Sequence, residues 1–255
     1  RVNMVVVQIR IVIIILSLVL SFFTLKSESS AQVSAGKIYV VPVSGTVDPG
    51  MAAFIKRSLE ASSSDPESLL ILEFDTFGGW VDSALQIVDT LLSAPKGRTI
   101  AYVKNKAISA GALIALASSK IVMKNNTTIG DCAPITYSSE GPKVLGEKFQ
   151  SPLRAKFRAL AKRNGYPETL AESMVTAEMV VYAVRLDGKT HYMDSQAFED
   201  LSQSDKEQIQ SKKTIVREGE LLTMDDAEAL ELVNKAARSK GDQDTSDVGG
   251  RHRAI

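Results

Sequence analysis

The chain has 255 residues, of which 44% are hydrophobic and 24% charged, so it can bury one medium-sized core and is not a wholly disordered protein. Its 30 Lys and Arg balance 30 Asp and Glu, and this zero net charge excludes the basic surface typical of nucleic-acid binding. A single cysteine, Cys132, excludes an internal disulfide, and with only two histidines in the chain we expect no metal and no cofactor.

The N-terminus differs from the rest of the chain. Arg10 precedes an apolar run over residues 11–25, and small polar residues follow. The run is shorter than the about 20 residues of a membrane helix, which predicts a signal peptide within residues 1–35. If the apolar run is counted from Met4 it is longer, so an uncleaved membrane anchor remains an alternative to a signal peptide. With Arg10 on the inner side, the rest of the chain is expected on the periplasmic or other extracytoplasmic face of the membrane.

Beyond residue 36 the pattern alternates strands and helices. A β-branched strand over residues 37–43 is followed by Asp48 as a helix cap and Pro49 at the first helical position. The nearly continuous apolar run over residues 68–75 is typical of a strand buried on both faces of a parallel sheet. Residues 80–92 place apolar side chains on one stripe, which predicts an amphipathic helix.

The middle of the chain continues the alternation. A third strand over residues 98–103 leads into a small-residue helix that begins at Ser109, and a fourth strand follows at residues 120–124. A further helix is predicted from an N-cap at Ser151 to residue 164. This order favours an α/β fold of repeated strand-helix units with right-handed crossovers.

The C-terminal part predicts a hairpin and a helix. Two strand-like runs flank Asp187 and Gly188, a dipeptide that favours a tight hairpin turn. Thr223 and Asp226 have the spacing of a capping box before an apolar helical face. Residues 239–255 are polar and aperiodic, and we expect them to be a disordered tail.

Two features could carry chemistry, and both follow predicted strands. Gly78 and Gly79 expose backbone N–H groups that could bind an oxyanion, although a simple tight turn explains them equally well. Ser109 could be a nucleophile, with the N–H groups of Ala110 and Gly111 and the helix dipole beside it. Considered alone, a serine in this place is more often a helix cap.

A nucleophilic serine needs a base, and the chain offers few. The two histidines, His191 in the hairpin and His252 in the tail, are poor candidates. A lysine can serve when desolvation lowers its pKa from about 10.4 towards 7 or 8. Lys148 has Leu145 and Phe149 near it, but in most folds such a lysine would lie on the surface.

Four segments together carry a family resemblance: LEFDTFGGWVDSALQIVDTLLSAP, ISAGALIALASSKIVM, TTIGDCAPI and EKFQSPLRAKFRALAKRNG. In this order they resemble the serine-protease domain of the NfeD family, membrane-associated relatives of the Clp protease in the Clp/crotonase superfamily. The resemblance covers about residues 37 to 235 and implies a Clp-like protease domain over residues 36–238. It implies a Ser-Lys dyad, which falls on Ser109 and Lys148. The implied oxyanion hole falls on Gly78, Gly79 and Ala110.

The resemblance also implies a function. Such a protein would be an exported serine endopeptidase that cleaves hydrophobic segments of membrane proteins, with stomatin-like partners and a homo-oligomeric assembly. Phe77 stands where the family's turn usually has proline. Two alternatives stay open: a catalytically silent scaffold for a stomatin-like membrane partner, and a crotonase-type enzyme acting on acyl-CoA.

Overall fold

The computed structural model describes residues 36–240 and 252–254, so the predicted signal peptide or anchor over residues 1–35 lies outside the described residues. Within the described part, no helix is long and apolar enough to cross a membrane. The main sheet contains β1 (Ile38–Val47), β2 (Leu69–Gly79), β3 (Thr99–Ile108), β4 (Lys120–Lys124), β5 (Thr128–Gly130), β11 (Thr223–Asp225) and β12 (His252–Ala254).

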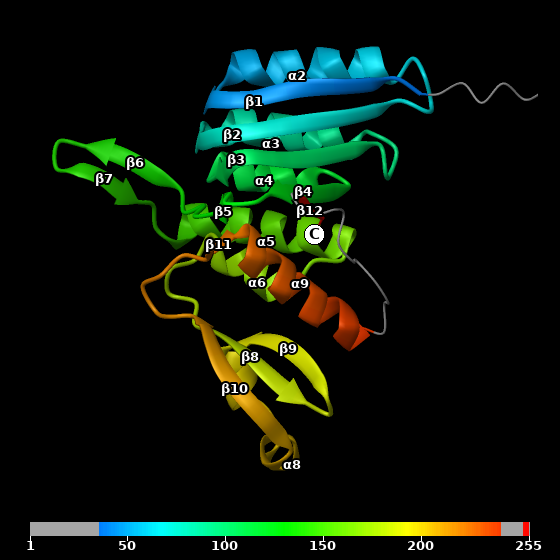
Figure 1. Cartoon of the computed structure of the whole chain (residues 1–255). Helices are drawn as coiled ribbons and strands as arrows, with labels where there is room; N and C mark the ends of the chain where they lie inside the picture. The colour runs from blue at the N-terminus through cyan, green and yellow to red at the C-terminus, as the bar shows by residue number, and fades with distance from the viewer. Residues whose placement is uncertain (1–35, 241–251, 255) are drawn as a thin grey trace, which may run out of the picture. The chain divides into compact units, whose positions relative to one another are not determined.

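The core of this sheet is parallel, as the strand-helix alternation predicts. Strands β1, β2, β3 and β4 lie side by side in chain order and run in the same direction (Figure 1). Strand β3 then parts from β4, and its last residues, Lys106 to Ile108, pair with β5 instead. This fork places the end of β3, just before Ser109, between the ends of β2 and β5.

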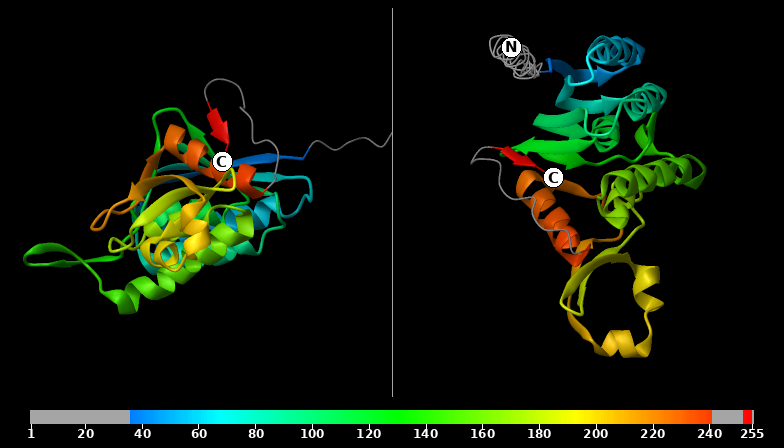
Figure 2. Two further views of the ribbon diagram at one scale, coloured as in Figure 1. Left: turned by 90° about the horizontal axis from the view of Figure 1, so that it is seen from below. Right: turned by 90° about the vertical axis from the view of Figure 1, so that its right-hand side faces the viewer.

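Three helices cover one side of the sheet, as Figure 2 shows: α2 (Pro49–Ser62), α3 (Val81–Leu92) and α4 (Ala110–Ala117). Helix α2 begins as predicted, with the Asp48 carboxylate accepting a hydrogen bond from Met51 N at 2.8 Å. Burial alternates along β2, where Leu70, Leu72 and Phe74 are fully buried and the residues between them are half-buried. The prediction that β2 is buried on both faces is therefore wrong, because in the described chain the helices cover one face only.

The remaining helices and a separate small sheet complete the domain. Helices α5 (Glu147–Asn164), α6 (Glu168–Ser173) and α9 (Asp226–Lys240) pack below the main sheet in Figure 1. The predicted hairpin around Asp187 and Gly188 is present and belongs to a three-stranded antiparallel sheet. This sheet contains β8 (Val181–Leu186), β9 (Lys189–Asp194) and β10 (Ile209–Val216), with α7 (Ser195–Glu199) and α8 (Gln203–Glu207) in the connection.

A second hairpin was not predicted from the sequence. Strands β6 (Ile135–Ser138) and β7 (Gly141–Val144) pair only with each other and project from the body of the domain in Figure 1. The pairing opposes Ile135 to Val144, and both side chains are exposed. This hairpin leads directly into α5.

Two predicted helix starts are wrong. Helix α5 begins at Glu147 rather than after a cap at Ser151, because Phe149 N and Gln150 N already bond to Gly146 O at 2.9 and 3.3 Å. Helix α9 is capped by Asp225, whose carboxylate accepts from Glu228 N at 2.8 Å, whereas Thr223 pairs with Gly130 in the sheet.

The C-terminal end also differs from the expected tail of residues 239–255. Helix α9 continues to Lys240, and residues 252–254 form β12, which pairs antiparallel with β4. The outer edge of β4 carries unpaired backbone groups that such a segment can satisfy even when its composition is polar. Residues 241–251 and 255 lie outside the described part of the chain.

Candidate active site

Ser109 lies in a strained turn between β3 and α4. Its φ of 55° and ψ of −120° fall in a region that residues with a side chain rarely adopt. Although Ser109 occupies the N-cap position of α4, its side chain makes no capping hydrogen bond. A serine cap has extended backbone angles and uses its hydroxyl to bind the helix amides. The geometry therefore excludes the capping interpretation and leaves the hydroxyl available.

Hydrogen bonds to a neighbouring loop hold Ser109 in this strained conformation. Ser109 N donates to Gly130 O at 3.0 Å, and the Cys132 thiol donates to Ser109 O at 3.4 Å. The loop is fixed in turn, since Asp131 N donates to Leu222 O at 3.1 Å. A side chain at Gly130 would meet Leu222 O at 2.2 Å, so only glycine allows this close approach.

In the sequence, Cys132 is notable only as the single cysteine, which excludes an internal disulfide. The structure gives it a place against the serine turn, where burial raises the pKa of the Cys132 thiol well above its ordinary value. A protonated thiol can donate to the Ser109 carbonyl, whereas a thiolate cannot. Its bond to Ser109 crosses between loops, so no local sequence pattern indicates it.

The glycine turn lies against Ser109, as the resemblance implies. A Cβ at Gly78 would come within 2.6 Å of Ser109 Cβ and 3.1 Å of Ala110 N. However, Gly78 N already donates to Thr76 Oγ1 at 2.9 Å. The structure thus gives Gly78 the role of allowing close approach rather than of a free donor.

The N–H groups of Gly79 and Ala110 lie where neither a neighbouring strand nor the helix supplies an acceptor. Trp80 N donates to Val47 O at 2.8 Å, and because N–H groups alternate along a strand, that of Gly79 points away from β1. The pairing of β2 with β3 ends at Thr76, so it does not reach Gly79. Ala110 N lies in the first turn of α4, where helix amides lack a helical acceptor.

A small apolar cavity of about 30 Å³ opens beside Ser109. It lies between α3, α4 and α5 and is lined by Gly79, Val81, Ala84, Ser109, Ala110, Leu113, Cys132, Pro134, Leu153 and Phe157. Large apolar side chains are exposed on the segments around it: Phe77, Trp80, Val81, Ile135, Val144 and Phe149. Phe77, the residue in place of proline, is 76% exposed, and Lys106 Nζ lies 4.5 Å from the centre of its ring.

Lys148 is not brought onto Ser109 in this arrangement. It lies in the first turn of α5, is exposed to solvent, and makes no hydrogen bond or ion pair with another described residue. The apolar surroundings expected for a neutral lysine are therefore absent from the described single chain. His191 lies on β9 and His252 on β12, and neither lines the cavity beside Ser109.

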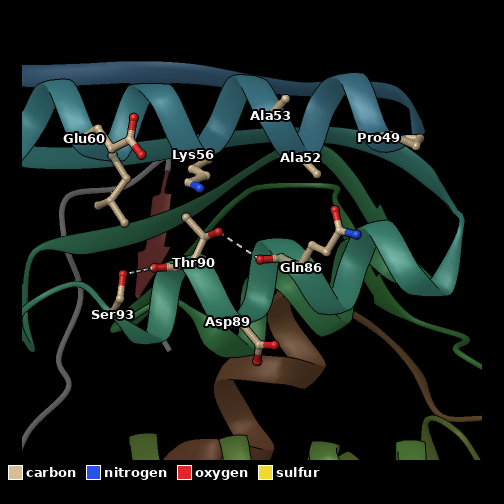
Figure 3. Close-up of a pocket in the computed structure, with 10 residues that line it drawn as sticks. Pro49, Ala52, Ala53, Lys56, Glu60, Gln86, Asp89, Thr90 and Ser93 are labelled. Carbon is tan, nitrogen blue, oxygen red and sulfur yellow. Dashed lines mark hydrogen bonds between the residues drawn. The ribbon is translucent and has the colours of Figure 1, made fainter.

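The larger cavity of about 620 Å³ lies elsewhere, in the groove between α2 and α3 shown in Figure 3. Its lining mixes small and polar side chains, including Ala52, Lys56, Gln86 and Asp89. It shares no lining residue with the cavity beside Ser109.

Comparison with known proteins identifies the family. Residues 37–216 match the family model described as NfeD1b, N-terminal domain. The chain belongs to this family. Over 150 residues it is 30% identical to membrane protein NfeD1b of Bacillus subtilis, which covers 59% of this chain and 33% of that protein. Over 167 residues it is 30% identical to the membrane-bound protease PH1510 of Pyrococcus horikoshii, covering 64% of this chain and 38% of the relative.

The matched part of this NfeD chain thus spans 33% and 38% of the length of these two relatives. Among solved structures, it is similar to a serine-to-alanine mutant of the 1510-N membrane-bound stomatin-specific protease, with a TM-score of 0.56, 23% identity and coverage of 78% of both chains. A lysine-to-alanine mutant of that protease with a substrate peptide gives a TM-score of 0.52 at 23% identity. These likenesses establish that the chain shares the α/β fold of that protease.

The close approach at Gly78 predicts a stability difference between two glycines with positive φ. Gly78→Ala adds a clash with Ser109 to the strain of a left-handed residue, so we expect a loss of about 3 kcal/mol or more in unfolding free energy. Gly97 has φ of 88°, but a Cβ added there would meet no atom within 4 Å, so Gly97→Ala should cost about 1 kcal/mol. Urea denaturation measures both, and equal losses would contradict the close approach.

The environment of Cys132 predicts a protected thiol. We expect iodoacetamide at pH 8 to alkylate the folded chain roughly 100-fold more slowly than the urea-unfolded chain, because burial hinders access and disfavours the thiolate. Since Cys132 is the one cysteine in the sequence, mass spectrometry of the intact chain reports on it alone. Equal rates in the two states would mean that Cys132 does not pack against Ser109.

Proposed function

We propose that this NfeD chain is an exported, membrane-associated serine endopeptidase in which Ser109 is the nucleophile and Lys148 the general base. The observation that carries the proposal is the backbone of Ser109, which is strained without gaining a capping bond. Strain of this kind is costly and is found mostly at functional sites. The adjoining apolar cavity and the unpaired N–H groups of Gly79 and Ala110 support the same chemistry.

The mechanism follows from these groups. The neutral amine of Lys148 takes the Ser109 hydroxyl proton while Oγ forms a bond to the carbonyl carbon of the peptide. Gly79 N–H and Ala110 N–H donate to the resulting oxyanion, with Gly78 giving them room to approach. The protonated lysine gives its proton to the leaving amine as the C–N bond breaks. Water then attacks the acyl-enzyme, Lys148 takes its proton, and that proton returns to Ser109 Oγ as the ester bond breaks.

The surroundings of Ser109 favour a hydrophobic substrate. Exposed side chains such as Phe77, Trp80 and Phe149 could contact an apolar segment on both sides of the scissile bond. The cavity beside Ser109 is lined mostly by carbon and would accept an apolar side chain of that segment. A relative is named a stomatin-specific protease, so we propose a stomatin-like membrane protein as substrate or partner and a homo-oligomeric assembly.

The dyad is tested by three alanine variants assayed on a hydrophobic peptide. Ser109→Ala and Lys148→Ala should each reduce the rate by at least about 1,000-fold, because each removes a group without which the serine is not activated. Lys156→Ala is the matched control, because Lys156 lies on the same helix and pairs with Asp89 at 3.4 Å. It should retain the wild-type rate. Retained hydrolysis in Ser109→Ala or Lys148→Ala would disprove the dyad.

A silent scaffold is the second candidate, and the exposed position of Lys148 is the observation that favours it. A scaffold would bind a membrane partner equally well with and without Ser109 and would cleave nothing. Partner capture that is unchanged in Ser109→Ala, together with no hydrolysis by the wild type, would establish it in place of the peptidase.

A further inference from the structure

The first turn of α5 directs Lys148 away from the site. Leu153 and Phe157, on the same helix, line the cavity beside Ser109. Side-chain direction in an α-helix turns by about 100° per residue, so Lys148 lies about 140° from Leu153 and about 180° from Phe157. With the first turn helical, the lysine therefore lies on the side of α5 opposite the cavity.

A proline weakens the attachment of this turn to the rest of the helix. Pro152 is inside α5, four residues after Lys148. Proline has no N–H to donate to the Lys148 carbonyl, and its ring crowds that carbonyl. The segment from Glu147 to Ser151 is thus joined to α5 by one backbone hydrogen bond fewer than a continuous helix would have. The missing bond lowers the cost of unwinding this turn, whereas the buried Gln150 side chain, which donates to Leu145 O at 2.8 Å, opposes it.

One side chain bridges the proline and holds the turn in place. The Arg154 guanidinium pairs with the Glu147 carboxylate, while its other terminal nitrogen donates to Thr176 Oγ1 at 3.0 Å. Thr176 is buried, and the Arg154 side chain is 21% exposed, whereas that of Glu147 is 69% exposed. Arg154 is therefore anchored in the body of the domain and binds the residue next to Lys148.

We propose that Arg154 is a positioning residue whose pair with Glu147 acts as a latch, holding Lys148 away from Ser109. When the pair opens, the turn before Pro152 unwinds and the lysine can swing round the helix to the serine. The latch rests on the proposed Ser109–Lys148 chemistry and would regulate it. It also accounts for an exposed lysine in a chain whose serine turn is already formed.

The latch is tested with Glu147→Gln, Arg154→Gln and the double variant, assayed on a hydrophobic peptide. Exposed ion pairs are weak, so we expect each variant to raise kcat/KM by roughly two- to fivefold. Since both single variants break the same pair, the double variant should rise no further. Glu172→Gln is the matched control, because it breaks the Arg158–Glu172 pair (3.1 Å) one turn further along α5 and should leave the rate unchanged.

The two single variants separate the latch from a simple charge effect. Loss of a carboxylate near an amine makes its deprotonation easier, whereas loss of a guanidinium makes it harder. A charge effect would therefore raise the rate in Glu147→Gln and lower it in Arg154→Gln. The latch predicts a rise in both. A fall or no change in either one would overturn the latch.

A measurement independent of catalysis completes the test. The amides of Phe149 and Gln150 bond to Gly146 O, so their hydrogen exchange reports opening of the first turn. Exchange at these two amides should be faster in Glu147→Gln and Arg154→Gln, with no change near Leu160; unchanged exchange would overturn the latch.

If Ser109→Ala still hydrolyses the peptide, the proposed function itself fails. If Ser109 and Lys148 are required but neither latch variant raises the rate, the latch alone fails.

Discussion

The site depends on the backbone of a single residue, Ser109, held in a conformation that its side chain makes unfavourable. Such strain persists only when the surroundings determine it. Here the fork of β3 supplies the surroundings, because it brings the ends of β2 and β5 to either side of the turn. Gly130 accepts from the serine amide, and Gly78 leaves space for the serine side chain.

These contacts tie the serine to distant parts of the chain. The loop that holds Ser109 is itself bound through Leu222 O, which belongs to the connection between β10 and α9. In contrast, Lys148 lies beyond a projecting hairpin and before a proline. The proposed nucleophile thus lies at the end of a strand in the main sheet, while its proposed base lies on a helical turn that a proline weakens. With Ser109 fixed and Lys148 on a turn that can open, the proposed site would be complete only when that turn opens.

The sequence predicts much of the fold because its local patterns agree with the packing. The alternation of strands and helices, the Asp48 cap and the Asp187–Gly188 turn are all found in the structure. The predicted start of α5 is wrong because a serine followed by proline looks like an N-cap, whereas the chain had already turned helical at Glu147. That difference of five residues, from the expected cap at Ser151 to the observed cap at Gly146, decides where Lys148 points.

The sequence indicates only part of the candidate site. Ser109 and the paired glycines could be singled out as candidates because they follow strands whose ends meet at one edge. The contributions of Cys132, Gly130 and Thr76 could not, since each acts through a contact between segments that the sequence does not place together. The distinct roles of Gly78 and Gly79 also depend on pairing register, which only the structure gives.

Covalent labelling would show whether Ser109 is an activated nucleophile. The chain would be incubated with a serine-reactive phosphonate and mapped by mass spectrometry of its peptides. We expect one adduct per chain, on Ser109, and much slower labelling in Lys148→Ala. The absence of an adduct on Ser109, or labelling spread over the chain's other serines at similar rates, would contradict it.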